Sequence, residues 1–212
     1  MKLRYKIFII SVVLLASGSL YAIADAKAIS PLETLKEPID QILVLLNDPS
    51  YQGQKGQALQ RKKIWKIARP VFNLEEISRR AIGKSWERFS SDEKSQFTKI
   101  FTDFLGNTYI DKLQGEFHNI IIDFDKELVK GSKALVRTRL RRETVEIPID
   151  YRMQQIDGVW KIYDILVENG VSIVKNYFVQ FNSMLQKGSP ADLIEQLEKK
   201  LAQQQKNSSK QP

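Results

Sequence analysis

Four segments with the pattern of β-strands follow one another between residues 117 and 167, and the links between them are too short to hold a helix. The segments are 117–124, 134–140, 145–153 and 160–167, and the turn residues Lys130-Gly131-Ser132 and Asp157-Gly158 separate two pairs of them. Strands that are joined by short links pair antiparallel, because a parallel neighbour needs a long crossover connection. The block therefore predicts a four-stranded antiparallel sheet.

Alternation within these segments divides the predicted sheet into an apolar face and a polar face. In the third segment Val145, Ile147, Ile149, Tyr151 and Met153 share one face, and the residues between them are mostly polar. Such alternation is typical of a sheet that packs against other elements on one side only.

Helical spacing of apolar residues dominates the chain on both sides of this block. The segments with this spacing are 31–46, 57–68, 74–89, 91–113, 171–185 and 190–201. Ser30, Asn73 and Ser90 each precede a helix and have an acidic residue three positions on, which is typical of a helix N-terminus. Helices segregated from an antiparallel sheet define the α+β class, and a curved sheet under several apolar helix faces can enclose an apolar cavity.

The first 24 residues have the pattern of a signal peptide. Lys2, Arg4 and Lys6 precede an apolar run over 7–16, and Ala22-Ile23-Ala24 has small residues at the spacing of a cleavage site. An uncleaved membrane anchor is the alternative, because no charged residue occurs from 7 to 24. We expect cleavage and export, a folded domain over 25–202, and a polar disordered tail over 203–212.

Residues that carry catalytic or metal chemistry are scarce in this chain. It contains no cysteine and a single histidine, His118, which alternates along a strand with apolar residues. Thiolate chemistry and multi-histidine metal sites are therefore excluded, and His118 is expected to be a packing or surface residue. The most suggestive carboxylate is Asp164, which lies between Tyr163 and Ile165 and is expected to have a structural role.

A basic strip on the second strand has two interpretations. Arg137, Arg139, Arg141 and Arg142 could form a solvated strand face, or could attract an anionic lipid surface or an acidic partner. Nucleic acid is not expected as a partner, because aromatic residues do not alternate with these arginines and the chain is predicted to be exported.

Three blocks of sequence, in order, resemble a known family. The first is FNLEEISRRAIGKSW over 72–86, the second runs from Phe101 to Asn107-Thr108-Tyr109, and the third extends from Ile149 to Phe181. Together they resemble the MlaC family of periplasmic phospholipid-binding proteins, also called toluene-tolerance auxiliary proteins. The chain departs from the family pattern at Phe178, where many relatives have a basic residue, and at Asn169, which lengthens a loop.

The resemblance implies a function as well as a fold. It implies a periplasmic carrier that holds the acyl chains of a phospholipid in an apolar cavity. Its implied partners are an outer-membrane lipoprotein complex and an inner-membrane ABC transporter complex with a lipid-binding domain. It implies maintenance of outer-membrane lipid asymmetry, no cofactor apart from the lipid cargo, and no catalysis.

Periodicity and the resemblance together select apolar and aromatic residues as candidates for the cavity lining. They are Phe101, Leu105, Tyr109, Ile147, Ile149, Tyr151, Met153, Ile162, Val174, Tyr177 and Phe181. We expect about half of these to line the cavity and the rest to be ordinary core, with the hydroxyls of Tyr109 and Tyr151 near the cavity mouth.

Two functions from other classes stay open on the sequence. One is an exported enzyme on a cone-shaped α+β fold, with Asp164 and a tyrosine as acid–base pair. The other is a chaperone or scaffold that binds polypeptide.

Overall fold

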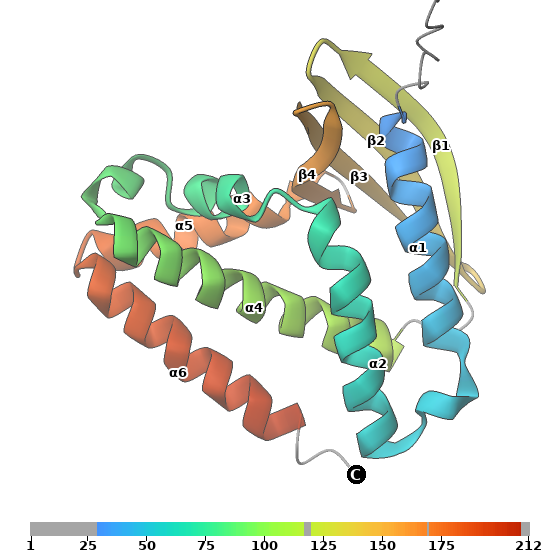
Figure 1. Ribbon diagram of the computed structural model, residues 1–212, viewed down its shortest axis with the longest axis horizontal. Coiled ribbons are helices and arrows are strands. Elements are labelled where there is room, and N and C mark those ends of the chain that lie inside the picture. Colours follow the sequence, from blue (N-terminus) through green and yellow to red (C-terminus); the bar gives the residue numbers. More distant parts are fainter. Residues whose placement is uncertain (1–28, 117–119, 169, 209–212) are drawn as a thin grey trace, which may run out of the picture.

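A computed structural model describes residues 29–116, 120–168 and 170–208 of the 212-residue chain. The predicted signal peptide, His118 and Asn169 lie outside the described residues. The described chain is α+β, with helices before and after a single antiparallel sheet, and this confirms the predicted fold class (Figure 1). Within these ranges, no helix combines the length and the apolar character needed to cross a bilayer.

The sheet is a meander of strands in sequence order, and it has one more strand than predicted. Its members are β1 (Ile121–Lys130), β2 (Lys133–Arg142), β3 (Val145–Ile156), β4 (Val159–Val167) and β5 (Val171–Ser172). The two residues of β5 pair with the end of β4 after a turn in which Gly170 has a φ of 85°. Helical spacing begins so close to Val171 that the sequence assigned this short strand to the following helix.

The tight turns form where the sequence predicts them. Gly131 connects β1 to β2 with a φ of 56°, and Asp157 and Gly158 connect β3 to β4 with φ values of 49° and 80°. Positive φ at both central residues matches the right-handed twist of the flanking strands. These turns fix the register of the two hairpins that they close, with Lys130 opposite Lys133 and Ile156 opposite Val159.

Most helices begin at the caps that the sequence indicates. They are α1 (Pro31–Asn47), α2 (Gly53–Ala68), α3 (Leu74–Ile82), α4 (Ser91–Glu116), α5 (Ile173–Leu185) and α6 (Pro190–Ser208), with short 3₁₀ helices η1 (Pro49–Tyr51), η2 (Arg69–Val71) and η3 (Gly83–Arg88). Ser30 and Ser90 each form a reciprocal capping box, with Glu33 and Glu93 respectively.

Two helices extend beyond their predicted ends. α2 begins four residues earlier than predicted, and a Cβ at Gly56 would lie 2.5 Å from the backbone of Tyr51 in η1, so only glycine allows this start. α6 continues to Ser208, into the segment for which the sequence predicts a disordered tail. Gln204 in that segment donates a 2.7 Å hydrogen bond to the Thr108 hydroxyl on α4, which ties the added turns to the fold.

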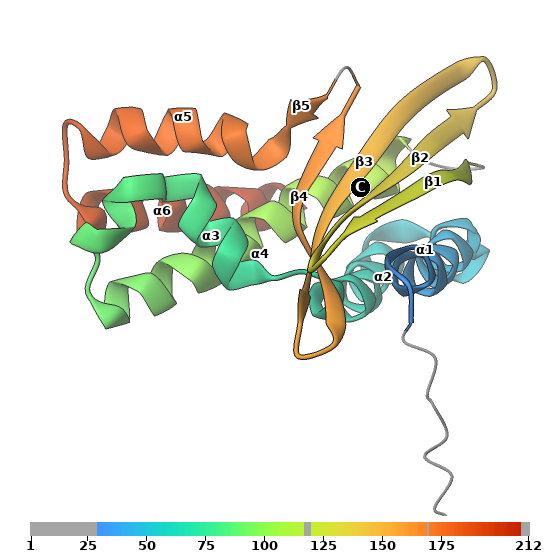
Figure 2. The ribbon, with the colours of Figure 1, turned by 90° about the horizontal axis from the view of Figure 1, so that it is seen from above.

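The elements form two bodies (Figures 1 and 2). α3, α4, α5 and α6 pack on one another and form what we call the helical lobe. α1 and α2 lie side by side next to the sheet, where α1 covers β1 and β2. The chain passes from the sheet body to the helical lobe at Phe72 and Asn73. There the Asn73 N–H donates a 2.8 Å hydrogen bond to the Ile162 carbonyl of β4.

The buried apolar residues of the described chain form three clusters, one in the lobe, one at the sheet and one that joins α1, α2 and α4. The helical cluster lies inside the lobe around Phe97, Phe101 and Phe181. The sheet cluster joins Leu35 of α1 to the inner face of the sheet, and a third cluster joins α1, α2 and α4 through Leu46, Ile64 and Ile110. Phe72 packs against both the helical cluster and the sheet cluster, and we call the boundary that it bridges the seam.

Candidate functional site

The eleven predicted lining residues are distributed over both bodies. Five of them are buried, namely Phe101, Met153, Ile162, Val174 and Phe181. Six are half-buried, namely Leu105, Tyr109, Ile147, Ile149, Tyr151 and Tyr177. No contact in the structure identifies a cavity lining among them, so their role as a lipid site remains a prediction.

On the lobe side the structure brings the predicted aromatic residues together. The ring centroid of Phe101 lies 5.1 Å from those of both Tyr177 and Phe181, and the Tyr177 and Phe181 centroids are 5.6 Å apart. Edge-on contacts of this kind add to the stabilisation that apolar burial provides. Tyr177 and Leu105 are only partly buried at the margin of this cluster, so their side chains keep some surface free of packing.

Two tyrosine hydroxyls of the lobe are neighbours. The Tyr109 hydroxyl on α4 and the Tyr177 hydroxyl on α5 lie close enough that each influences the pKa of the other. Burial is the main cause that raises the pKa of Tyr109, and burial together with the neighbouring Tyr109 raises the pKa of Tyr177 to about 12. The pair thus puts two neutral polar groups among half-buried apolar side chains.

On the sheet side the predicted residues divide between cluster and margin. Met153 and Ile162 are part of the sheet cluster, and Tyr151 packs against it. Burial raises the pKa of the Tyr151 hydroxyl to about 12. Ile147 and Ile149 are half-buried and belong to none of the three clusters, although they lie on the same face of β3 as Tyr151.

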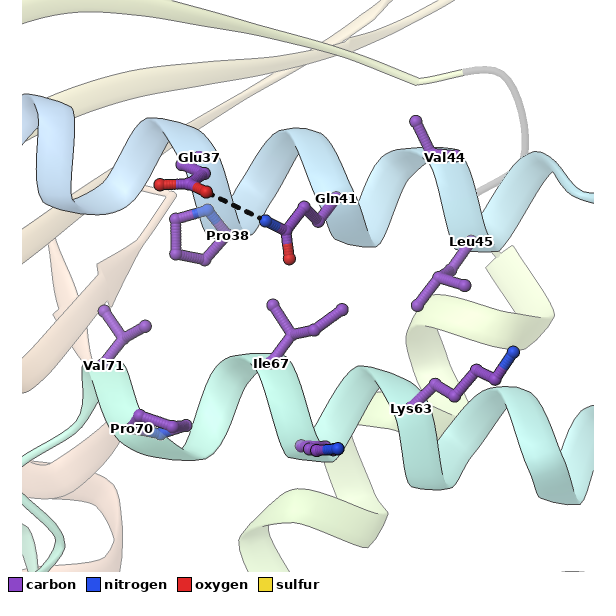
Figure 3. A pocket seen from close by; sticks show the side chains of 10 residues that line it. Glu37, Pro38, Gln41, Val44, Leu45, Lys63, Ile67, Pro70 and Val71 are labelled. Atoms are coloured by element: carbon purple, nitrogen blue, oxygen red, sulfur yellow. Dashed lines mark hydrogen bonds between the residues drawn. The ribbon is translucent and has the colours of Figure 1, made fainter.

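The structure also contains an open groove that the sequence does not indicate. The groove lies between α1 and α2, encloses about 760 Å³, and has apolar walls, with Pro38 and Leu45 facing Ile67 and Val71 (Figure 3). The groove is also lined by the apolar residues Val44 and Pro70 and by the polar or charged residues Glu37, Gln41, Lys63 and Lys66. None of the eleven predicted residues lines this groove, because helical spacing shows which face of each helix is apolar and not where two helices diverge.

Asp164, the candidate base of the enzyme alternative, is 5% exposed and fully engaged as an acceptor. The Ser172 hydroxyl lies 2.9 Å from both carboxylate oxygens, the Val174 N–H donates at 3.3 Å, and Arg152 approaches at 3.3 Å. The carboxylate thus fastens β4 to the first turn of α5. These contacts explain how a carboxylate can be buried here, and they give Asp164 the structural role that the sequence predicts.

The predicted arginine strip is largely paired with carboxylates. Arg139 forms two hydrogen bonds with Asp125, at 2.8 and 2.9 Å, and Arg137 lies 3.5 Å from Asp150. Arg141 forms an ion pair with Asp123, and the hydrogen bond from Arg141 is the main cause that lowers the pKa of that carboxyl. The contacts favour the interpretation as a solvated strand face.

Phe178, the departure from the family pattern, has a packing role. Its ring lies against Gly83 at the end of α3, where an added Cβ would be 2.5 Å from the Phe178 ring. Among the residues that the structure describes, no group of three or more acidic or histidine side chains could hold a metal ion.

Comparison with known proteins identifies the family. The family model described as MlaC protein matches residues 36–199, which includes α2 to α5 entirely and most of α1 and α6. No curated protein matches the chain. Among solved structures, a phospholipid-binding protein from Ralstonia solanacearum, in complex with a phospholipid, aligns with a TM-score of 0.72 and 21% identity over 81% of this chain and 96% of that one.

The two findings support each other at different levels. At 21% identity the Ralstonia structure shows that the folds agree. The family model extends over most of the described residues and includes all three blocks on which the sequence resemblance rests. The chain therefore belongs to the MlaC family.

Proposed function

We propose that this protein is a phospholipid carrier of the periplasm. The observation that carries the proposal is the match to the MlaC family over residues 36–199. The phospholipid-bound Ralstonia protein of the same fold supports it. Family membership points to a binding or carrier protein rather than to an enzyme, and the structural role of Asp164 agrees with this.

We place the acyl chains at the seam between the helical lobe and the sheet. A domain of this size ordinarily has one contiguous apolar core, whereas the buried residues here form separate clusters on the two sides. The six half-buried candidates lie on both sides, with Leu105, Tyr109 and Tyr177 on the lobe and Ile147, Ile149 and Tyr151 on β3. Acyl chains between them would cover apolar surface that is otherwise only partly packed.

Elementary energetics explain why a carrier is needed. A phospholipid has on the order of 30 methylenes, and moving each into water costs about 0.8 kcal/mol, so free diffusion between membranes is negligible. Transfer from a bilayer to an apolar protein interior changes little free energy, because both environments exclude water. The protein can therefore load and release its cargo with a small net change.

The proposed route connects two membrane complexes. One is an outer-membrane lipoprotein complex, and the other is an inner-membrane ABC transporter complex with a lipid-binding domain. The carrier takes lipid from one complex and delivers it to the other, and this transfer maintains outer-membrane lipid asymmetry. A carrier whose own loading is nearly neutral cannot set the direction of transport. The direction follows from different affinities of the loaded and empty forms for the two complexes.

Extraction of bound lipid tests the proposal. The full chain is expressed in a Gram-negative host, purified from the periplasmic fraction, extracted with organic solvent and analysed by mass spectrometry. We expect about one phospholipid per protein. Recovery of the protein without lipid, or with bound peptide instead, would contradict a lipid carrier.

Two substitutions test the proposed position of the acyl chains. Leu105→Arg and Ile149→Arg introduce a charge on either side of the seam and should abolish lipid co-purification, because an unpaired guanidinium is costly in an apolar site. Val179→Arg on α5 and Val129→Arg on β1 introduce the same charge at exposed positions and should retain lipid. Circular dichroism confirms folding, and full lipid content in both folded seam variants would refute this position.

A further inference from the structure

Helix α2 carries a stripe of basic residues that the cargo site does not explain. Lys55, Leu59, Lys62, Lys66 and Arg69 follow one another at spacings of four, three, four and three residues, so they lie on one face of the helix. All five are exposed, and Arg69 continues the stripe because its backbone remains helical at the C-cap. The stripe is about 21 Å long at the rise of an α-helix.

No carboxylate of the described chain forms an ion pair with this stripe. Between Asp48 and Glu75 the chain has no acidic residue. Within the described chain none of the four basic side chains of the stripe forms an ion pair or a hydrogen bond, whereas Arg61 on the inner side of α2 pairs with Asp111. The arginines Arg137, Arg139 and Arg141 on the outer sheet face are paired, so α2 is where unpaired positive charge concentrates.

Apolar surface accompanies the charge. Leu59, in the middle of the stripe, is 49% exposed. Next to the stripe opens the α1–α2 groove, and Lys66 is among the residues that line it. The groove is also lined by Pro70 and Val71 (Figure 3). An anionic membrane surface attracts clustered lysine and arginine side chains, and an exposed leucine among them can enter the headgroup region.

We propose that the outer face of α2 binds the surface of a bilayer that contains anionic phospholipids. Three of the four charges are lysines, which attract phosphate as point charges and are depleted at interfaces between proteins. The stripe contains no aromatic anchor of the kind that dominates protein interfaces. The four charges also lie in a straight row, so all four can contact the headgroups of a flat membrane surface at once.

The charges of α1, the neighbour of α2, determine how the protein is oriented on the membrane surface. α1 exposes Glu33, Glu37 and Asp40, of which Asp40 pairs with Lys36 at 2.7 Å. An anionic bilayer repels this side and attracts α2, so the protein rests on α2 and not on the α1 side of the groove. The proposal concerns the membrane surface and holds independently of what fills the seam.

Vesicle sedimentation with a charge-matched control tests the proposal. The probes are vesicles of phosphatidylcholine, with and without phosphatidylglycerol, at low and high salt. The wild-type chain should sediment only with the anionic vesicles and be released by salt. Lys62→Glu/Lys66→Glu should reduce partitioning by about tenfold or more, since each lysine near an anionic surface contributes substantially to binding.

The control makes the same change of charge outside α2. Lys187→Glu/Lys200→Glu alters two exposed lysines in and before α6 and should bind vesicles nearly as the wild type does. Equal loss in both double variants would show a general effect of net charge and overturn the assignment to α2. Wild-type binding that does not depend on phosphatidylglycerol would overturn it too, as would binding to an acidic protein without any binding to vesicles.

A site-specific dye provides a second measurement. Because the chain has no cysteine, Leu59→Cys creates a unique attachment point for a polarity-sensitive fluorophore. Its emission should shift to the blue with anionic vesicles, while the same dye at Ala191→Cys, at the start of α6, should not respond. Lipid content, measured on the same samples by mass spectrometry, separates failure of this proposal from failure of the carrier proposal. An unchanged spectrum at position 59 on sedimented protein would refute contact through α2.

Discussion

Gly83 shows how one residue determines the fit of two helices. It ends α3 with φ 62° and ψ −132°, a conformation that residues with a Cβ rarely adopt, and the Phe178 ring on α5 occupies the space where a Cβ would be. Close approach of α3 and α5 therefore depends on the missing side chain. Phe178 uses the space that Gly83 leaves and so stabilises the lobe by packing instead of by charge.

Gly83→Ala should lower the free energy of unfolding by about 2 kcal/mol, through backbone strain and the contact with Phe178. Urea denaturation measures the loss. Adding Phe178→Ala to Gly83→Ala removes the steric part and leaves the backbone part, so the double variant should lose less than the sum of the two single changes. Strict additivity would show that the Phe178 contact is unimportant.

At the scale of elements, the junction between the sheet and α5 depends on Asp164. This carboxylate accepts hydrogen bonds from Ser172 and Val174, and Ser172 in turn caps α5 by accepting from the Lys175 N–H at 2.9 Å. β4, β5 and the first turn of α5 are therefore held by one network. Removing the carboxylate would leave donors without partners in a buried place.

Asp164→Ala should destabilise the protein by about 2–3 kcal/mol, since its hydrogen bonds involve a charged acceptor. Asp150→Ala is the matched control, because Asp150 lies on the neighbouring strand and its pair with the exposed Arg137 is worth at most about 1 kcal/mol. Thermal unfolding compares the two. A loss for Asp164→Ala no larger than for Asp150→Ala would contradict its role at the junction.

At the scale of the whole molecule, the burial of tyrosines on both sides of the seam has a consequence for stability at high pH. Burial raises the pKa of Tyr151 on the sheet side to about 12, against an ordinary value of 10.0, and burial together with the neighbouring Tyr109 raises that of Tyr177 on the lobe side to about 12. The unfolded chain releases both protons near pH 10, while the folded protein keeps them. The contribution of these two tyrosines to the free energy of unfolding is complete below pH 10 and is lost as the pH rises toward 12.

The free energy of unfolding should therefore fall between about pH 10 and pH 12. Urea denaturation across this range measures the fall, and absorbance of tyrosinate should show late ionisation. Tyr151→Phe and Tyr177→Phe should each make the decline less steep, which separates these tyrosines from the lysines that titrate in the same range. Ionisation of all tyrosines near pH 10 would contradict their burial.

Local signals in the sequence were sufficient for most of the fold. Ser30 and Ser90 begin helices as predicted, and Asp157-Gly158 forms the predicted turn, because caps and tight turns depend on a few adjacent residues. The same locality explains the misses. β5 exists because it pairs with β4, and the end of α6 persists because Gln204 reaches α4, and both partners are distant in sequence.

For the candidate sites, the sequence identified residue types but not their surroundings. It selected Phe101, Tyr177 and Phe181, which the structure packs together, and it singled out the arginines of β2, which the structure pairs with carboxylates. The stripe on α2 has a regular spacing that was visible in the sequence, but only the fold shows that its charges lack partners.

The sequence by itself determined the class of the fold, the turns, the caps and the family likeness, because these follow from short-range sterics, hydrogen bonding and hydrophobic period. The tertiary structure decided that Phe72 packs between two separate clusters of buried residues and that Asp164 joins β4 to α5. It also decided that the row of basic side chains on α2 has no carboxylate partner among the residues that the structure describes, whereas Arg61 on the same helix pairs with Asp111. Burial and pairing depend on residues brought together from far apart in the chain, and no local pattern contains that information.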